Sequence, residues 1–269
     1  MSNSISLEHE PGASGLGRLI TPSGSQLVQC SDVSGLARAV ARMLARDGIV
    51  QFAGIATQAQ FHQLTTHLGV PWHELFVYPS PGEQNFVRNP KEVAFHTDSR
   101  RADLVGWYCV RPCSSGVANL YLDGWDACAG LTEAERAALV GVTCQDPLQQ
   151  GRLAESGPEE PILELTDAGP RLFWLPHRLN IPEEGRRLAA LRKLAARLSG
   201  EDDVRVVPVR LQRGNFVIID NHRFLHGRLA IPADSPRLLY RLWINSSGWP
   251  DAEEHRVVSP TEPTISSRP

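Results

Sequence analysis

The stretch LVGWYCVRPCSSGVANLYL, residues 104–122, holds two short apolar runs, 104–110 and 117–122, with Pro, Ser and Gly between them. Runs of the same kind recur further along the chain, at residues 161–165, 171–175, 204–211, 216–220 and 238–245. Many short strands separated by turn residues are typical of a β-sandwich or barrel. The sequence therefore predicts a mainly β fold with flanking helices, built on a double-stranded β-helix, or jelly-roll, core.

The region before this core has the pattern of two helices around one strand. Residues 32–46 carry apolar side chains at helical spacing and arginines on another face, and Gly48 is the expected end of that helix. Residues 49–52 are expected to form a short strand, and Thr57 to cap a second helix. The chain is therefore expected to open with α/β structure.

Two further helices are expected to interrupt the strands. Thr132 and Glu135 have the spacing of a capping box, in which each side chain satisfies the other residue's backbone N–H. Residues 182–198 carry leucines at helical spacing, and Gly200 follows as a stop signal. The core is thus predicted to carry a helical insert.

Length and composition indicate one globular domain. The chain has 269 residues, of which 42% are hydrophobic and 21% charged, which is the balance of a chain with one well-buried core. We expect a polar N-terminal segment at 1–30, a single jelly-roll domain with its N-terminal helices and helical insert at 31–246, and a polar C-terminal tail at 247–269.

Charge, hydropathy and cysteine usage limit which classes of binding partner and which cellular compartment are expected. The net charge is −3 with Lys and Arg scattered, so no nucleic-acid partner is expected. No signal peptide and no apolar run long enough for a membrane helix occur, so we expect no membrane partner. The five cysteines form no Cys-x-x-Cys pair, which favours reduced thiols in a cytoplasmic protein. A small-molecule partner fits best, and the oligomeric state stays open.

The stretch FHTDS, residues 95–99, is the first candidate for chemistry. His96 and Asp98 are two positions apart, so on an extended chain both side chains point to the same side and can bind one metal ion. The same pair also fits a surface turn in which the aspartate caps a neighbouring residue. A third ligand is needed to decide between the two interpretations.

His226 is the candidate third ligand, because it lies beyond the expected strand 216–220, where the mouth of a barrel would be. Two histidines and one carboxylate suit non-haem iron(II), since they occupy one face of an octahedron and leave three positions open. His222 is the rival, but on the opposite pleat it is expected to pack or to support the site. Asp220 and Asn221 are expected to fix the turn by hydrogen bonds to the backbone.

An arginine is expected beside such a metal. If a 2-oxo acid chelates the iron, its second carboxylate needs a cation in an apolar barrel, and the guanidinium fork suits that task. Arg241 is the candidate, because it stands in the apolar run 238–245, where a charge requires a partner.

In these residues the sequence resembles the taurine dioxygenase and clavaminate synthase-like superfamily of iron(II)/2-oxoglutarate oxygenases. Residues 45–54 are similar to the N-terminal element of that family, and His96-Thr97-Asp98 to its first metal motif. Residues 220–228 are especially similar to the distal motif of gamma-butyrobetaine and trimethyllysine hydroxylases, and Arg241 sits at the family's usual position for the cosubstrate arginine.

The resemblance implies an enzyme with iron(II), the cosubstrate 2-oxoglutarate and O₂. It implies His96, Asp98 and His226 as metal ligands and catalytic residues, and Arg241 as the cosubstrate clamp. The chain departs from the family at Ala118, where relatives have Thr or Ser, so either Asn119 takes over or the cosubstrate relies on arginine alone. The other candidates are Arg237 for the cosubstrate and, for the substrate, Arg100, Trp107, Trp174, His177 and Arg228.

The implied reaction oxidises an unactivated C–H bond of a small molecule and releases succinate and CO₂. Hydroxylation is the reaction expected first, while desaturation, epoxidation and cyclisation remain open. The carboxylate of Asp98 disfavours halogenation. An amino acid, an amine or an intermediate of natural-product biosynthesis would be the substrate by family analogy. Two alternatives remain: a jelly-roll metal enzyme that does not use 2-oxoglutarate, and a non-catalytic jelly-roll binding protein.

Overall fold

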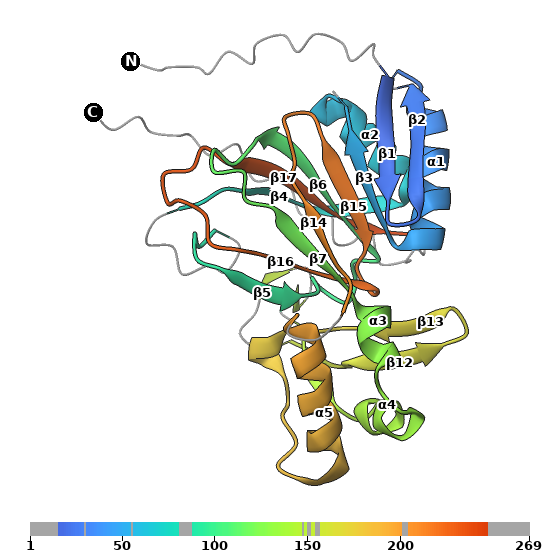
Figure 1. Ribbon diagram of the computed structural model, residues 1–269, viewed down its shortest axis with the longest axis vertical. Helices are drawn as coiled ribbons and strands as arrows, with labels where there is room; N and C mark the ends of the chain where they lie inside the picture. Colours follow the sequence, from blue (N-terminus) through green and yellow to red (C-terminus); the bar gives the residue numbers. More distant parts are fainter. Residues whose placement is uncertain are drawn as a thin grey trace.

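Two antiparallel β-sheets face each other and form the body of the protein (Figure 1), as the predicted jelly roll requires. The computed structural model describes residues 16–29, 31–54, 56–80, 88–146, 148–149, 152–153, 157–200 and 204–246. The expected tail at 247–269, Cys30 and residues 1–15 of the expected N-terminal segment lie outside the described residues.

The larger sheet has seven strands in the order β2-β1-β3-β15-β6-β17-β4. They are β1 (Leu16–Thr21), β2 (Gly24–Gln29), β3 (Ile49–Ala53), β4 (Val70–Val77), β6 (Leu104–Arg111), β15 (Phe216–Asp220) and β17 (Leu238–Asn245). The smaller sheet has four strands in the order β14-β7-β16-β5. These are β5 (Val93–His96), β7 (Asn119–Asp123), β14 (Val206–Val209) and β16 (Phe224–Arg228).

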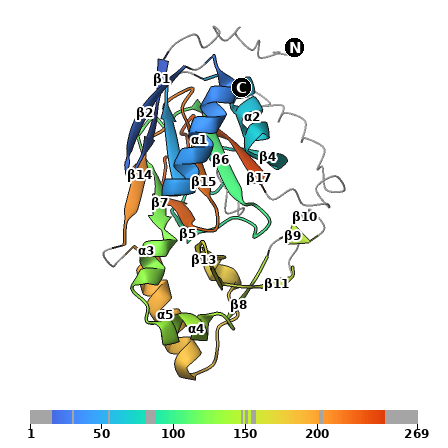
Figure 2. The ribbon, with the colours of Figure 1, turned by 90° about the vertical axis from the view of Figure 1, so that its right-hand side faces the viewer.

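Two helices, α1 (Val33–Asp47) and α2 (Gln58–Leu68), cover the outer face of the larger sheet (Figure 2). Asp32 caps α1 by accepting the Gly35 N–H, and Gly48 ends the helix in the left-handed conformation at φ 72°. Thr57 and the side chain of Gln60 form a capping box on α2. The predicted opening of the chain is confirmed in both helices and in the strand between them.

The strand β15 is apolar at successive positions and does not alternate between apolar and polar residues. Phe216 and Ile218 pack against the helices on one face of the larger sheet. Val217 and Ile219 belong to the core between the two sheets on the other face. Because both faces of this strand are buried, the period-two pattern of a half-exposed strand is absent.

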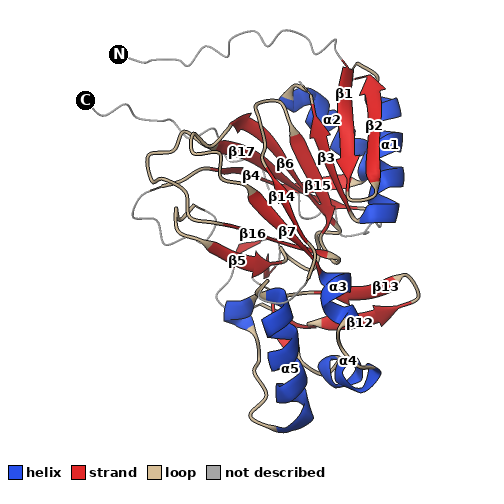
Figure 3. Cartoon of the chain, viewed as in Figure 1, coloured by secondary structure: helices blue, strands red, loops and turns tan. Residues whose placement is uncertain are grey.

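A separate lobe is inserted between β7 and β14 and lies at the lower end of the molecule in Figures 1 and 3. Its own apolar core includes Leu163, Leu191 and Leu194, and the barrel residues Leu122 and Leu225 complete it. The lobe contains α3 (Gly124–Ala129), α4 (Glu133–Leu139), β8 (Thr143–Gln145), β9 (Leu148–Gln149), β10 (Arg152–Leu153), β11 (Glu159–Pro161), β12 (Leu163–Thr166), β13 (Gly169–Leu172), η1 (Pro176–Arg178) and α5 (Gly185–Leu198).

The structure differs from the expected elements in three places. Residues 16–29, expected to belong to a polar segment, form β1 and β2 and extend the larger sheet from β3. The helix expected from residue 182 begins only at Gly185, which has a φ of 81° and therefore follows a turn. The structure also adds β4, β5, β16 and α3 and, in the inserted lobe, β8, β9, β10 and η1. In the part of the chain that the structure describes, no helix is both long and apolar enough to span a membrane.

Candidate metal centre and its cavity

The strand register brings the two candidate histidines together. His96 is the last residue of β5, and His226 lies in β16, where the antiparallel register places the two residues opposite each other. His226 follows the end of β15, as expected, and lies within the next strand, which belongs to the smaller sheet. Asp98 follows β5 by two residues and is buried.

The three side chains form a compact cluster. Their possible ligand atoms all lie within 4.8 Å of one another, and among the described residues no other such group of His, Cys, Asp or Glu occurs. The Nε2 atom of His226 is 3.9 Å from Oδ2 of Asp98. The centroids of the two imidazole rings are 4.2 Å apart. One ion at the centre of this cluster could contact all three residues.

The protonation states suit a metal. Burial lowers the pKa of His96 and lowers that of His226 well below its ordinary value, so both rings are neutral at pH 7. The Ala94 carbonyl accepts a hydrogen bond of 2.9 Å from Nδ1 of His96, which leaves Nε2 as the ring's lone-pair atom. Burial alone would raise the pKa of Asp98, but the positive charge of Arg241 and a hydrogen bond from Trp243 lower it, so the side chain is a carboxylate.

Hydrogen bonds hold Asp98 in place from two directions. Nη1 of Arg241 lies 3.0 Å and 3.2 Å from its two carboxylate oxygens, and the indole N–H of Trp243 donates to Oδ2 over 2.7 Å. The side-chain oxygen of Asn221 accepts the Asp98 backbone N–H over 2.9 Å. Asn221 also donates to the backbone carbonyls of Ser99 and Ala102, so it holds the loop after β5, 123 residues away in the chain, and not its own turn as expected. Asp220 does hold that turn, because its carboxylate accepts the His222 backbone N–H.

His222 lies outside this cluster. Its Nε2 atom is 3.2 Å from the Asp103 carboxylate, and its backbone N–H donates to the side chain of Asp220. The structure therefore places His226, and not His222, beside the His96 and Asp98 pair.

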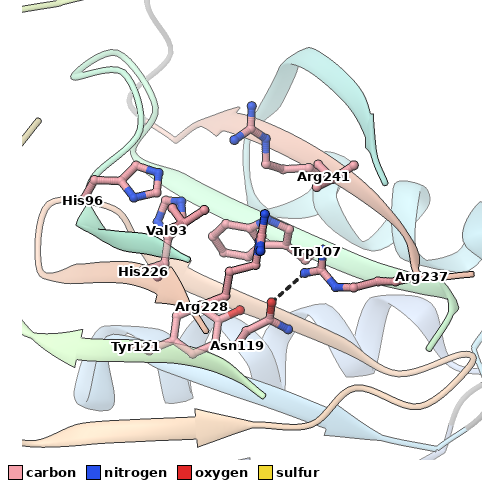
Figure 4. Close-up of a pocket in the computed structure, with 11 residues that line it drawn as sticks. Val93, His96, Trp107, Asn119, Tyr121, His226, Arg228, Arg237 and Arg241 are labelled. Atoms are coloured by element: carbon pink, nitrogen blue, oxygen red, sulfur yellow. Dashed lines mark hydrogen bonds between the residues drawn. The ribbon is translucent and has the colours of Figure 1, made fainter. Parts of the chain in front are cut away.

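A cavity opens beside the histidines (Figure 4). Its apolar wall includes the Trp107 ring, whose centroid is 4.7 Å from that of His226 in an edge-on arrangement. The residues that line the cavity are Val77, Val93, His96, Trp107, Asn119, Tyr121, His226, Gly227, Arg228, Arg237 and Arg241.

Three buried arginines make this cavity strongly positive. Nη2 of Arg237 donates to Oδ1 of Asn119 over 2.7 Å, and the guanidinium of Arg228 donates to the backbone carbonyls of Asn89 and Lys91. Within the described chain, neither Arg228 nor Arg237 forms an ion pair with a carboxylate, whereas Arg241 pairs with Asp98. Burial and the neighbouring Arg237 lower the pKa of Arg228 to about 10, so it stays charged at pH 7.

Three of the expected substrate contacts lie elsewhere. Arg100 is held between Glu164, 2.6 Å away, and Glu160, 3.4 Å away, so it joins the metal loop to the inserted lobe. Trp174 is buried; its backbone carbonyl accepts the Thr97 backbone N–H, and its backbone N–H donates to the Thr97 hydroxyl. His177 is exposed on η1. None of the three lines the cavity.

Sequence reasoning missed several residues of the cavity. Tyr121 lies opposite His226 in the pairing of β7 with β16, and it is almost completely buried. Val77 and Val93 end and begin strands that were not expected, so nothing in the sequence marked them. The Tyr121 position could have been found only by knowing which strand pairs with β16.

Comparisons with known proteins identify the family of the chain. The chain matches the family model of the taurine catabolism dioxygenase TauD, TfdA family over residues 13–243. No curated protein sequence matches it.

Solved structures share the fold. The structure is similar to that of asparagine oxygenase in complex with Fe(II), 2S,3S-3-hydroxyasparagine and succinate, with a TM-score of 0.64 and 20% identity over 79% of this chain and 80% of that one. It is also similar to the non-heme iron oxygenase OrfP in complex with Fe, succinate and (3R,4R)-dihydroxy-L-Arg, with a TM-score of 0.62 and 17% identity over 81% and 85% of the two chains. The family match covers most of the sequence, and the chain belongs to the taurine catabolism dioxygenase TauD, TfdA family.

Proposed function

We propose that this protein is an iron(II)- and 2-oxoglutarate-dependent dioxygenase that oxidises an unactivated C–H bond of a small molecule, with succinate and CO₂ as coproducts. The observation that carries the proposal is the buried cluster of His96, Asp98 and His226, which opens on a cavity lined by arginines. Hydroxylation is the favoured outcome, because similar structures hold hydroxylated amino acids. The carboxylate of Asp98 disfavours halogenation, which would need a small residue at that position.

The three residues fit iron(II) by their chemistry. Two neutral imidazoles and one carboxylate are the donor set of non-haem iron oxygenases, and they lie close enough to share one ion. When bound, iron(II) with 2-oxoglutarate supplies the activation of O₂ that breaks the C–H bond. The protein's task is to hold the ion, the cosubstrate and the substrate in register and to keep water out.

The arginines of the cavity provide the cosubstrate site. Arg241 lies at the metal end, where its guanidinium contacts Asp98. Arg237 is buried, with a relative exposure of 6%, and has no described carboxylate as a partner, so a cosubstrate carboxylate would supply its missing counter-charge. We therefore assign the carboxylate remote from the metal to Arg237, in place of Arg241, which the sequence suggested for it and which is already paired with Asp98. The end of the cosubstrate nearer the metal is assigned to Arg241.

Asn119 takes the place of the hydroxyl that relatives have near Ala118. Its Oδ1 atom accepts from Arg237, so its amide N–H₂ group is the part that can donate to an anion. In Figure 4 the Asn119 and Arg237 side chains meet below Trp107. This pair is the basis for preferring Asn119 with arginine over arginine alone.

The substrate class is proposed from the relatives. Structures of similar fold hold 3-hydroxyasparagine and dihydroxy-arginine, so free amino acids are the first class to test, followed by amines and natural-product intermediates. The four described cysteines form no disulfide, in keeping with a cytoplasmic enzyme.

The test is a screen for succinate formation. Purified protein is incubated with iron(II), ascorbate, 2-oxoglutarate and O₂ and with each member of a panel of amino acids and amines. We expect at least one compound to stimulate succinate release, and Asp98→Ala to abolish it. An enzyme that binds iron tightly yet never converts 2-oxoglutarate would instead support the jelly-roll metal enzyme without this cosubstrate.

A further inference from the structure

Trp243 touches the metal-binding carboxylate but is not one of the expected site residues. Its indole N–H donates to Oδ2 of Asp98 over 2.7 Å, and the tryptophan is 3% exposed. We propose that Trp243 is a positioning residue that orients Asp98 and raises the metal affinity of the site. This inference rests on the proposed role of His96, Asp98 and His226 as metal ligands.

The indole is held rigidly. Trp243 lies in β17, where it pairs with His73 of β4 and Val105 of β6. Its ring packs on His73 with centroids 4.4 Å apart and on Trp72 with centroids 5.4 Å apart. Two neighbouring strands and two rings therefore fix the direction of the N–H bond before any metal arrives.

Trp243 differs from Arg241, the other side chain that donates to the Asp98 carboxylate. Arg241 carries a charge on a long, flexible chain, and the proposed function assigns that charge to the cosubstrate. The indole is neutral, and its single hydrogen-bond donor is the N–H that contacts Asp98. It can therefore hold one oxygen of Asp98 without cancelling the negative charge that attracts a metal ion. Partners of this kind commonly change metal affinity by about 10- to 100-fold.

The neighbouring Trp72 supplies a matched control. It is buried against Trp243, with 8% exposure, and its indole nitrogen has no hydrogen-bond partner. A Trp-to-Phe substitution at either position removes the same atoms from the same aromatic cluster. Only at Trp243 does it also remove a hydrogen bond to a proposed metal ligand.

The experiment compares Trp243→Phe with Trp72→Phe in the full chain, by anaerobic titration with Co(II) in the absence of 2-oxoglutarate. We expect Trp243→Phe to weaken Co(II) binding by about 10-fold or more, and Trp72→Phe to change it less than twofold. Equal affinities for the two folded variants would overturn the inference. If wild-type protein binds Co(II) no better than His226→Ala, the proposed metal site itself fails, which is a different result.

A second measurement uses the wild-type protein and does not depend on the variant folding. Zn(II) is added to protein labelled with ¹⁵N in its tryptophans, and the indole N–H resonances are assigned through contacts with neighbouring rings. We expect the Trp243 indole proton to shift when Zn(II) binds, because its acceptor becomes a ligand, and the Trp72 proton to move far less. A Trp243 resonance that stays unchanged in metal-saturated protein contradicts the positioning role.

Discussion

At the scale of single residues, the unpaired charge of Arg237 is the feature with the clearest consequence. Among the described residues, the guanidinium of Arg237 donates only to an amide oxygen, so this buried charge gains most from an anion that enters the cavity. Arg228 differs, because backbone carbonyls already surround its guanidinium. The two arginines should therefore respond differently to the cosubstrate.

We expect Arg237→Met to raise the KM for 2-oxoglutarate by about 10- to 100-fold, since hydrogen bonds to a charged group contribute about 1.5–3 kcal/mol. Steady-state kinetics of succinate formation measure the effect. Arg100→Met is the control, because Arg100 pairs with Glu160 and Glu164 away from the cavity. A KM that changes equally in both variants would rule out the assigned role of Arg237.

His73 makes stability depend on pH. Burial, aided by the charge of Arg241, lowers the pKa of His73 from 6.5 to about 4. Between these two pH values the His73 ring takes up a proton in the unfolded chain but stays neutral in the folded protein. The unfolding free energy should therefore fall as the pH drops from 6.5 towards 4, by at most about 1.4 kcal/mol per pH unit for this proton. Urea unfolding at pH 7 and pH 5 checks this, and His73→Phe should reduce the slope. An unchanged slope would show that other groups cause it.

Which residues form the metal cluster could be predicted, because ligand chemistry and spacing are local features of the sequence. The contacts of Arg100 could not be predicted in the same way. Its partners Glu160 and Glu164 lie about 60 residues away in the inserted lobe, and no local sequence pattern indicates these ion pairs. Trp243 was passed over for a similar reason, since an apolar strand gives no sign of which tryptophan faces a carboxylate.

At the scale of elements, β5 and β16 must pack closely for the histidines to meet. A Cβ atom at Gly227 would lie 2.8 Å from the Val93 carbonyl oxygen of β5, so any side chain there pushes the two strands apart. Gly227 is thus the point at which strand spacing and metal geometry are coupled.

We expect Gly227→Ala to weaken metal binding and to destabilise the fold by about 1–3 kcal/mol. Metal titration and thermal unfolding measure the two effects. Gly106→Ala is the control, because a Cβ there would crowd the end of the Phe61 ring on the helical side, at 2.9 Å. That variant is expected to lose stability and to keep its metal affinity. If Gly227→Ala binds metal like the wild type, the spacing of the two strands does not limit the site.

The elements were predicted best where their burial is complete. The ranges expected for β15 and β17 match the structure, because long apolar runs leave little choice of boundary. The strand β2 gave no such signal, since only one of its residues is buried. Its pairing with β1, and not its sequence pattern, makes it a strand.

At the scale of the whole molecule, the inserted lobe and the metal-bearing barrel share one core. Leu122 and Leu225 belong to the strands β7 and β16, yet they pack with the lobe residues Leu163 and Leu194. Leu225 directly precedes His226. The lobe therefore supports the strand that carries a proposed ligand.

We expect Leu194→Ala to destabilise the protein by about 2–5 kcal/mol, because the leucine is fully buried. Urea unfolding followed both by tryptophan fluorescence and by circular dichroism should give one coincident transition, since the shared core couples lobe and barrel. Two separate transitions would show that the lobe unfolds independently of the barrel.

We propose that His96, Asp98 and His226 together hold an iron(II) that 2-oxoglutarate chelates. The most direct measurement is anaerobic visible spectroscopy of the protein with iron(II), before and after 2-oxoglutarate is added. We predict a metal-to-ligand charge-transfer band in the wild type and in His222→Ala, and no band in His226→Ala. Absence of the band in folded, iron-loaded wild-type protein, or its persistence in His226→Ala, would contradict the account.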